Sequence, residues 1–343
     1  MNKNFMRIVA FIIALMMTMQ CTIKKKDKPY NIKLHENLTI GRGEEDLKQI
    51  FKFILDITID KQGNIYVLDT NQGLVRKFDK WGNFLWELNR QGQGPGEFLR
   101  IVSLDVDDRG KLYIVDQRKR RIMIYSQEGN FLTEFKVEGG SPLKVALDSK
   151  GYIYISFLEG GKDFLLHRFT TDGKLVNSFV KADESEKNPS LRRTKNSIHF
   201  CIDNNDNIYV TFMWEYKVQC YSPDGKLVVS WARELPYIPT PPHILRKPNW
   251  LEVKGDIITW DIAVDSKNNI YTIWGSRAKE NGLIIDIFNS RGNHLGYFYS
   301  GIKPGDELQY IDIDHQDNLY IIEPLNEPKV FRFKMSRGLK GKN

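Results

Sequence analysis

The residues best placed to do chemistry occupy one position of a repeated pattern, four residues before an aspartate that recurs along the chain. All six are polar or amphipathic, and they are Asp56, Ser103, Lys144, His199, Asp261 and Tyr310. Carboxylates, an amine, an imidazole and hydroxyls that converge in a concavity form the default binding or proton-transfer site. The alternative is that these side chains only bond one another and water. Both interpretations require a fold that brings six distant positions together.

The elements that carry these positions repeat. Six segments share the order Asp, two variable residues, a turn residue, one variable residue, Ile or Leu, and Tyr. They run from Asp60, Asp107, Asp148, Asp203, Asp265 and Asp314 to Tyr66, Tyr113, Tyr154, Tyr209, Tyr271 and Tyr320. The turn residue is always Gly, Asn or Asp, which tolerate positive φ, and the leading Asp can bond the backbone two residues on. Each segment is therefore predicted to be a strand, a tight turn and a strand.

A second turn follows in five of the units. An aromatic residue precedes Asp, Ser, Thr or Asn and then a glycine three residues later, at Phe78, Tyr125, Phe169, Tyr221 and Phe288. Each unit thus has four short strands, and its repeated tyrosine lies 41 to 62 residues from the next. That period is typical of propeller blades. We predict an all-β, six-bladed β-propeller of four-stranded antiparallel blades, with the polar ring near the channel mouth on the face that carries the inter-blade loops.

The two chain ends are predicted to close this ring together. The sixth unit stops after a third strand at Lys329–Lys334, and Asn31–Ile40 can supply its missing outer strand. This pairing would leave no open sheet edge at the seam. We expect a signal segment at 1–21, a basic tether at 22–30, the propeller at 31–334 and a basic tail at 335–343.

The loops on the face of the inter-blade connections are a second candidate site. Residues 117–121 read Gln-Arg-Lys-Arg-Arg, and residues 232–256 contain five prolines. Arg118 and Arg120 could meet phosphate, sulfate or an acidic partner, or they could form a solvated edge. Tyr237 and Trp250 could line a rim over the channel mouth, or their loop could pack on the blade edge.

The amino terminus predicts export. Lys3 and Arg7 precede the apolar run Ile8–Met19, which is too short to span a bilayer comfortably, and Cys21 follows. This arrangement resembles the lipobox of bacterial lipoproteins, although Thr18-Met19-Gln20 departs from the usual residues. The resemblance implies a lipid on Cys21 and attachment to a membrane of the cell envelope. The alternative is an ordinary secretory signal with an incidental cysteine.

Charge argues against a nucleic-acid partner. The formal net charge of the 343 residues is +7, but ten Lys and Arg lie in residues 1–29 and 334–343 with a single acid. The chain between them holds 40 basic and 42 acidic residues. A nucleic-acid binder carries its positive charge on the folded surface.

The blade pattern and the segment Gly92-Gln-Gly-Pro-Gly-Glu-Phe98 resemble NHL-type six-bladed β-propellers of bacterial exported proteins, over about residues 31–333. The resemblance implies the fold and leaves the activity open, because propellers host many functions. We expect a binding or scaffold protein with a protein, peptide or glycan partner. The alternative is a metal-dependent propeller hydrolase, lactonase or lyase that uses Asp and His of the channel.

Metal and cofactor signatures are sparse. The sequence has no zinc-type Cys pairs, no His-Glu-x-x-His and no Gly-x-Ser-x-Gly. We expect no cofactor, although the Asp-rich turns 203–207 and 314–318 could bind calcium. Cys201 and Cys220 should lie on the first and third strands of one blade, beyond the reach of a disulfide.

Overall fold

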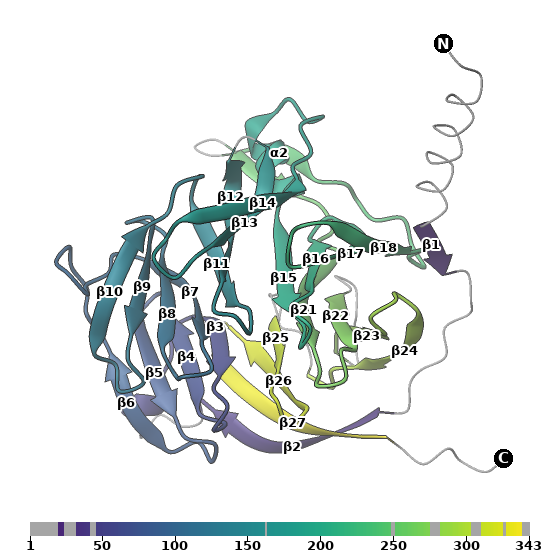
Figure 1. The fold of residues 1–343 in the computed structure, drawn as a ribbon. Helices are drawn as coiled ribbons and strands as arrows, with labels where there is room; N and C mark the ends of the chain where they lie inside the picture. Colours follow the sequence, from purple (N-terminus) through teal and green to yellow (C-terminus); the bar gives the residue numbers. More distant parts are fainter. Residues whose placement is uncertain are drawn as a thin grey trace, which may run out of the picture.

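The computed structural model describes residues 20–23, 32–41, 46–161, 163–247, 251–274, 282–302, 310–324 and 327–337. Within these residues the chain forms six antiparallel blades around a central axis (Figure 1). The prediction of a six-bladed all-β propeller is confirmed. Blades 1 to 3 comprise β3 (Ile54–Ile59), β4 (Ile65–Asp69), β5 (Leu74–Phe78) and β6 (Phe84–Leu88); β7 (Ile101–Val106), β8 (Leu112–Asp116), β9 (Arg121–Tyr125) and β10 (Phe131–Lys136); and β11 (Pro142–Leu147), β12 (Ile153–Gly161), β13 (Phe164–Phe169) and β14 (Leu175–Lys181).

The second half of the ring carries the additions to the basic pattern. Blades 4 to 6 comprise β15 (Ile198–Ile202), β16 (Ile208–Phe212), β17 (Glu215–Tyr221) and β18 (Leu227–Arg233); β21 (Thr259–Val264), β22 (Ile270–Trp274), β23 (Ile284–Phe288) and β24 (His294–Tyr299); and β25 (Tyr310–Ile313), β26 (Asn318–Glu323), β27 (Lys329–Arg337) and β2 (Ile32–Ile40). β1 (Gln20–Ile23) pairs in parallel with β18, so blade 4 has a fifth strand. The sequence did not predict this strand.

The repeated Asp and Tyr hold the first turn of every blade, which joins its first and second strands. In blade 1, Asp60 accepts hydrogen bonds from the backbone N–H groups of Gln62 and Asn64 at 3.0 and 2.8 Å. The Tyr66 hydroxyl donates to the other oxygen of the same carboxylate at 3.2 Å. All six turn residues have positive φ, from 60° to 85°. The repeat therefore encodes one turn six times over.

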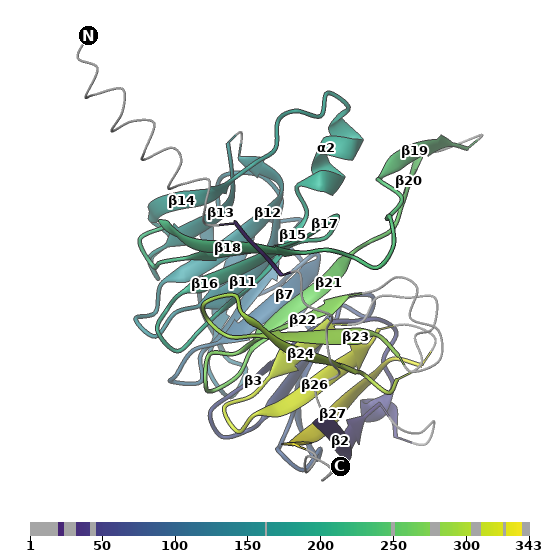
Figure 2. The same ribbon diagram turned by 90° about the vertical axis from the view of Figure 1, so that its right-hand side faces the viewer.

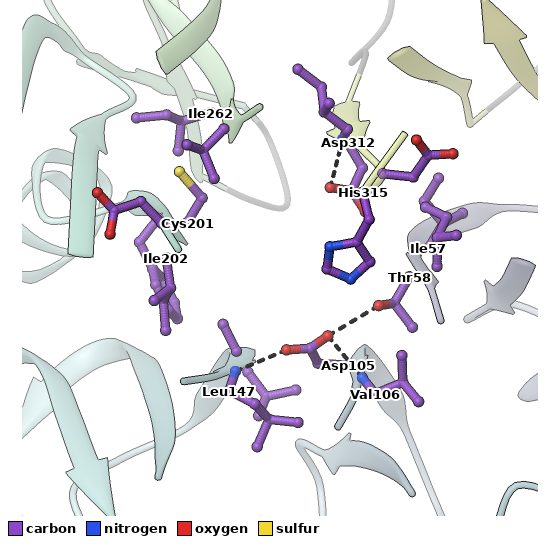
Figure 3. Close-up of a pocket in the computed structure, with 18 of the residues that line it drawn as sticks. Ile57, Thr58, Asp105, Val106, Leu147, Cys201, Ile202, Ile262, Asp312 and His315 are labelled. Carbon is purple, nitrogen blue, oxygen red and sulfur yellow. Dashed lines mark hydrogen bonds between the residues drawn. The ribbon is translucent and has the colours of Figure 1, made fainter. Parts of the chain in front are cut away.

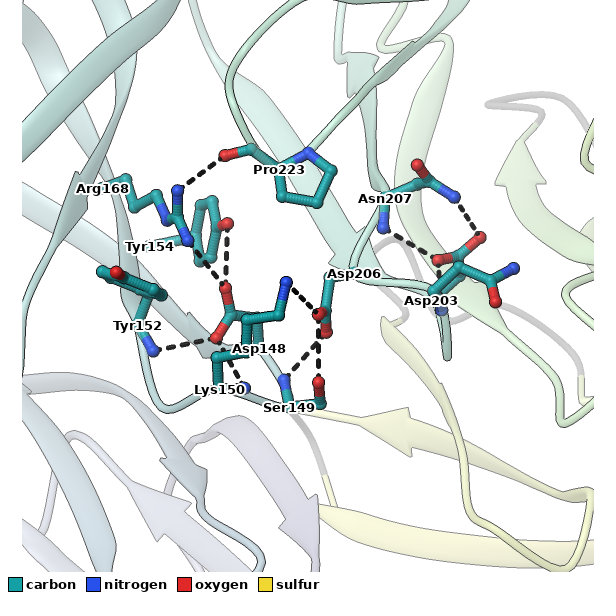
Figure 4. Close-up of polar contacts among 11 residues, drawn as sticks. Asp148, Ser149, Lys150, Tyr152, Tyr154, Arg168, Asp203, Asp206, Asn207 and Pro223 are labelled. Atoms are coloured by element: carbon teal, nitrogen blue, oxygen red, sulfur yellow. Dashed lines mark hydrogen bonds and ion pairs between the residues drawn. The ribbon is translucent and has the colours of Figure 1, made fainter.

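In blades 4 to 6 the turn residue is Asp206, Asn268 or Asp317, whereas in blades 1 to 3 it is glycine. Each of these three side chains accepts a hydrogen bond from the first turn of the preceding blade. Ser149 donates to Asp206 from its backbone N–H at 2.9 Å and from its hydroxyl at 3.0 Å (Figure 4). Ser266 bonds Asp317 in the same way, and Asn204 bonds Asn268. The departures from glycine thus link the first turns of blades 3 to 6.

The ring closes through the two chain ends, as predicted. β2 pairs antiparallel with β27 from Ile32 opposite Arg337 to Ile40 opposite Val330. The predicted boundary of the propeller at residue 334 is wrong, because β27 continues to Arg337. Met335 packs on the core cluster between blades 5 and 6, which explains the extension into the expected tail.

The glycine of the second repeated turn packs closely against the outer strand of the preceding blade. A Cβ on Gly292, which has a φ of +79°, would lie 2.6 Å from Cε3 of Trp231 on β18. Gly173 has the same relation to Phe135, at 2.5 Å. Successive blades therefore interlock at these turns, and apolar clusters fill the space between neighbouring sheets.

Two insertions project from the end of the ring opposite the first turns. A helix, α2 (Pro189–Lys195), precedes blade 4, and a hairpin of β19 (His243–Arg246) and β20 (Leu251–Lys254) follows it (Figure 2). A short 3-10 helix, η1 (Leu47–Gln49), precedes blade 1. No described helix has the length and apolar character needed to cross a membrane.

Candidate functional site

The first strands bring the predicted ring residues together around the channel axis. The Ser103 hydroxyl donates to Asp56 at 2.6 Å. Across the channel, Lys144 Nζ of blade 3 lies 3.7 Å from Asp261 Oδ1 of blade 5, and His199 Nδ1 of blade 4 lies 3.3 Å from the same oxygen. The rings of His199 and Tyr310 are 6.2 Å apart. The six positions therefore form one polar layer across the channel.

This layer borders a cavity of about 410 Å³ that extends along the first strands to the first turns. Asp56, Lys144, Asp261 and Tyr310 line the cavity, whereas Ser103 and His199 are not among its lining residues. The ring was expected near the opening on the face of the inter-blade loops. Its residues lie in the half of each first strand that adjoins those loops, whereas the described cavity extends from them toward the first turns. The cavity reaches the opposite end, where first-turn residues such as Lys61, Asn204 and His315 surround it.

The sequence analysis did not identify a second layer of channel residues. It lies two residues further along the first strands and consists of Thr58, Asp105, Ala146, Cys201 and Asp312, which line the cavity. Ala263, at the same position of blade 5, packs in the core cluster between blades 5 and 6. Figure 3 shows Asp105, Cys201 and Asp312 on three different strands around the cavity. The signal was available, because alternate residues of a strand face the same side. Two of these positions add carboxylates to the channel.

The channel aspartates also accept hydrogen bonds from backbone N–H groups at the exposed edges of the first strands. Each first strand is the inner edge of its blade, so its outward N–H groups lack a sheet partner. Asp56 accepts the N–H of Leu104 in the next blade at 3.1 Å, and Asp105 accepts that of Leu147 at 2.8 Å. The predicted alternative, in which ring residues bond across blades, therefore describes part of their role.

Burial shifts the protonation of three carboxyls toward the neutral form. Burial raises the pKa of Asp105 to about 6, against hydrogen bonds from Val106 and Thr58. It raises the pKa of Asp312 to about 8, with Lys144 opposing the shift. Burial also raises the pKa of Asp56. A carboxyl with a pKa near 8 holds its proton at neutral pH.

The pKa of Asp261 is instead lowered by its neighbours. Its side chain is 2% exposed, and burial alone would raise its pKa, but Lys144 and His199 outweigh burial and lower it. Burial would lower the pKa of Lys144, but Asp261, Asp56 and Asp312 raise it. Lys144 is thus the amine around which the channel carboxylates are arranged.

The basic run at residues 118–121 divides into two pairs. Lys119 Nζ donates to the carbonyls of Gly94 and Glu97, and Arg121 bonds Glu134. Arg118 and Arg120 line a separate cavity of about 600 Å³ at the end of the ring opposite the first turns. The sequence did not predict that Arg100, from the connection into blade 2, lines the same cavity.

The other predicted rim residues have different outcomes. Tyr237 is half-buried and packs on the core cluster between blades 4 and 5, so its part of the loop follows the predicted alternative. Trp250 lies outside the described residues. Pro239–Pro242 from the same loop meet Trp214 and Lys181 around a cavity of about 640 Å³ beside blade 4.

The remaining predictions concern cysteines and metals. Cys201 and Cys220 flank Tyr209 in register on successive strands of blade 4, and both are free thiols. The carboxylates of the turns at Asp203 and Asp314 accept backbone and tyrosine hydrogen bonds. Among the described residues, no three His, Cys, Asp or Glu side chains are grouped to hold a metal ion. Lipid attachment at Cys21 stays a prediction.

Comparisons with known proteins agree with this architecture. The chain is similar to a Bacteroides fragilis protein named as exported, with 11% identity, a TM-score of 0.60, and 93% of this chain and 99% of that chain covered. It is also similar to a DUF4221 family member from Bacteroides vulgatus, with 12% identity, a TM-score of 0.58, and 91% and 100% covered. Virginiamycin B lyase from Staphylococcus aureus has 12% identity, a TM-score of 0.52, and 88% and 99% covered.

These similarities show the fold alone, because all three identities are low. No curated protein matches the sequence. Residues 49–224, which include the first three blades and their channel residues, match the family described as 6-bladed beta-propeller. The chain therefore belongs to that 6-bladed beta-propeller family.

Proposed function

We propose that this protein is a binding protein that holds a small cationic ligand in its channel cavity. The observation that carries the proposal is the number of acidic side chains that line that cavity. Carboxyls of Asp56, Asp105, Asp261 and Asp312 line about 410 Å³, and among the channel layers of the described strands Lys144 is the one lysine. A ligand that brings positive charge would repay the burial of these acids.

The acids differ in how far their partners satisfy them. Lys144 forms an ion pair with Asp261 at 3.7 Å, and His199 Nδ1 lies 3.3 Å from the same carboxylate oxygen. Asp105 accepts hydrogen bonds from Thr58, Val106 and Leu147. Asp312 accepts a backbone hydrogen bond from Ile313, and burial raises its pKa to about 8, further than that of Asp105. We therefore assign the first contact with the ligand to Asp312.

Calorimetric titration of ethylammonium and of guanidinium into the full chain tests this proposal. Because Asp312 is mostly protonated at pH 7, binding of a cation should release a proton, which buffers of different ionisation enthalpy detect. Asp312→Asn should lose that proton release and weaken binding about tenfold, the effect of one charge-assisted contact. Asp172→Asn, an exposed turn variant, should behave as wild type. Failure of both cations to bind, or binding without proton release, would contradict the proposal.

We also propose that the protein is exported, that its repeats are of NHL type, and that a lipid on Cys21 attaches it to the cell envelope. The charged and apolar segments before Cys21 and the segment Gly92–Phe98 support these assignments, and one structural neighbour is named as exported. The small cationic ligand, or a cationic group of a protein, peptide or glycan partner, would then meet the cavity outside the cytoplasm. Labelling with radioactive palmitate should mark wild type and fail in Cys21→Ala.

An enzymatic role is the second candidate, and one observation favours it. A carboxyl with a pKa of about 8 beside an amine is suited to proton transfer, and some proteins of similar fold are named as lyases. Metal analysis of the purified chain separates the metal-dependent form of this candidate. A stoichiometric metal that is lost in Asp56→Ala or His199→Ala would favour the enzyme over the binding protein.

A further inference from the structure

We infer that the cavity lined by Arg100, Arg118 and Arg120 is a binding site for a phosphate- or sulfate-bearing group. This cavity lies at the opposite end of the ring from the first turns, so it is separate from the channel cavity. Its volume is about 600 Å³, and its other lining residues are Thr70, Asn71, Leu99, Gln117 and Ser141. None of these described lining residues is acidic, so the cavity carries three positive charges without an internal counter-charge.

The carboxylate of Asp116, the last residue of β8 before this turn, is hydrogen-bonded to the backbone. The carboxylate of Asp116 is fully buried and accepts the N–H groups of Leu99 and Arg100 at 2.7 and 3.2 Å. It also accepts those of Arg118 and Lys119, both at 3.0 Å. Asp116 therefore fixes the two segments that carry the arginines, and its oxygens face the backbone.

The guanidinium groups are available for a ligand. In the part of the chain that the structure describes, no hydrogen bond or ion pair involves the side chains of Arg100, Arg118 or Arg120. Lys119 and Arg121, the two other cations of the run, are bonded to Gly94, Glu97 and Glu134. Lys119 and Arg121 therefore have protein partners, whereas Arg118 and Arg120 border the cavity.

The backbone at Arg120 adds an independent observation. Arg120 has a φ of +54°, immediately before the third strand of blade 2. Blade 1 has Gly73 at the same place, with a φ of +62°. A left-handed conformation costs a non-glycine residue about 1 kcal/mol or more relative to glycine. The arginine therefore occupies a position that favours glycine for stability, which fits a side chain retained for binding.

The chemistry of the cavity favours a tetrahedral oxyanion. Arginine presents planar forks of N–H donors that match phosphate and sulfate oxygens, and three forks can engage several oxygens at once. The amide of Gln117 and the hydroxyl of Ser141 offer neutral donors beside them. The Thr70 hydroxyl donates its proton to the carbonyl of Ile101 at 2.6 Å, so it does not offer this proton to a ligand. A phosphate or sulfate group of a larger molecule fits this donor set.

Calorimetric titration of pyrophosphate and of sulfate into the full chain, at low salt, tests the inference. Arg118→Gln and Arg120→Gly should each weaken pyrophosphate binding at least about tenfold, because each removes charge-assisted hydrogen bonds. Arg120→Gly should also raise the Tm, because it relieves the left-handed backbone. Loss of binding in a more stable protein cannot come from misfolding. Arg109→Gln, an exposed first-turn arginine of the same blade, is the matched control and should bind within twofold of wild type.

Three outcomes would overturn the inference. The first is that neither anion binds the wild type. The second is that Arg118→Gln and Arg120→Gly bind as tightly as wild type. The third is that Arg109→Gln loses as much affinity as they do, which would indicate a general effect of charge. Titration with acetate belongs to the same series, and carboxylate binding as tight as pyrophosphate binding would refute the preference for a tetrahedral oxyanion.

A vesicle experiment separates the two sources of such a group. Phosphatidylcholine vesicles with and without phosphatidylglycerol are mixed with the full chain and then with pyrophosphate. Displacement of the phosphatidylglycerol-dependent binding in wild type, but not in Arg118→Gln, assigns the site to a lipid phosphate. Pyrophosphate binding that vesicles do not alter assigns it to a soluble phosphate or sulfate ester.

Discussion

Asp312→Asn should stabilise the protein at alkaline pH and leave its stability near pH 4 unchanged. Asp312 lies in the second channel layer, and burial raises its pKa from 3.8 to about 8 even though Lys144 opposes the shift. The unfolded chain gives up this proton near pH 4, whereas the folded protein keeps it until about pH 8. The folded state therefore loses stability as the pH rises through this window, and the whole cost is present above it.

The pKa difference sets the size of the effect. At about 1.4 kcal/mol for each pH unit, the interval from 3.8 to about 8 corresponds to at most about 6 kcal/mol. The neighbouring carboxyls titrate together with Asp312 and share this cost, so we expect about half of it, roughly 3 kcal/mol. With an unfolding entropy of about 2 cal/mol/K per residue, that value corresponds to a Tm increase of roughly 5 °C.

Differential scanning calorimetry of wild type and Asp312→Asn, from pH 4 to pH 9, measures the difference directly. The gain in Tm should grow across this range and level off above pH 8. Asp172→Asn is the control, because Thr170 lowers the pKa of that exposed carboxyl and its removal should give no gain at pH 9. A Tm difference that does not change with pH, or a loss of stability at pH 9, would refute the reasoning.

Three further predictions concern packing, charge and closure. Gly292→Ala should lower the free energy of unfolding by about 2–4 kcal/mol, because its Cβ would lie 2.6 Å from Trp231. Urea denaturation measures this loss, and Gly301→Ala, whose Cβ meets no atom within 4 Å, should lose only about 1 kcal/mol. Lys144→Met should steepen the fall in Tm between pH 5 and pH 8, because the amine lowers the pKa of three channel carboxyls, those of Asp56, Asp261 and Asp312; an unchanged slope in a pH series would contradict this. Deleting residues 32–40 should lower the Tm by at least about 10 °C, because it exposes an edge of blade 6, whereas removing residues 341–343 should have no such effect. Equal melting temperatures would disprove the closure.

The architecture could be predicted because its determinants are local. The repeated Asp, the turn residue and Tyr interact within one turn, so six copies of a short pattern indicate six similar hairpins. The closing strand was also predictable, since the last unit lacks a partner that only the early segment 32–40 can supply. Strand boundaries depend on packing between blades, and the extension of β27 to Arg337 could not be derived from the repeat.

The candidate sites were predicted in part because they depend on contacts between blades. Alternation along the first strand identifies the channel side, and it also predicts Asp105 and Asp312 once the second position of each strand is considered. The contact of Lys144 with Asp261 across the channel joins blades 3 and 5, and no local pattern encodes it. Arg100 joins Arg118 through the buried carboxylate of Asp116, a contact between segments about 17 residues apart.

The channel-facing side chains of each first strand can serve one of two roles. A polar residue there can bond the unpaired N–H groups of the next blade, or it can face a ligand. Asp56 and Asp105 bond Leu104 and Leu147 of the next blade, so their replacement should reduce stability and binding together. The Asp312 carboxylate bonds the N–H of the residue that follows it, so its replacement should separate the two roles. Binding lost at Asp312 with stability gained would therefore identify a carboxyl held in the channel for its ligand.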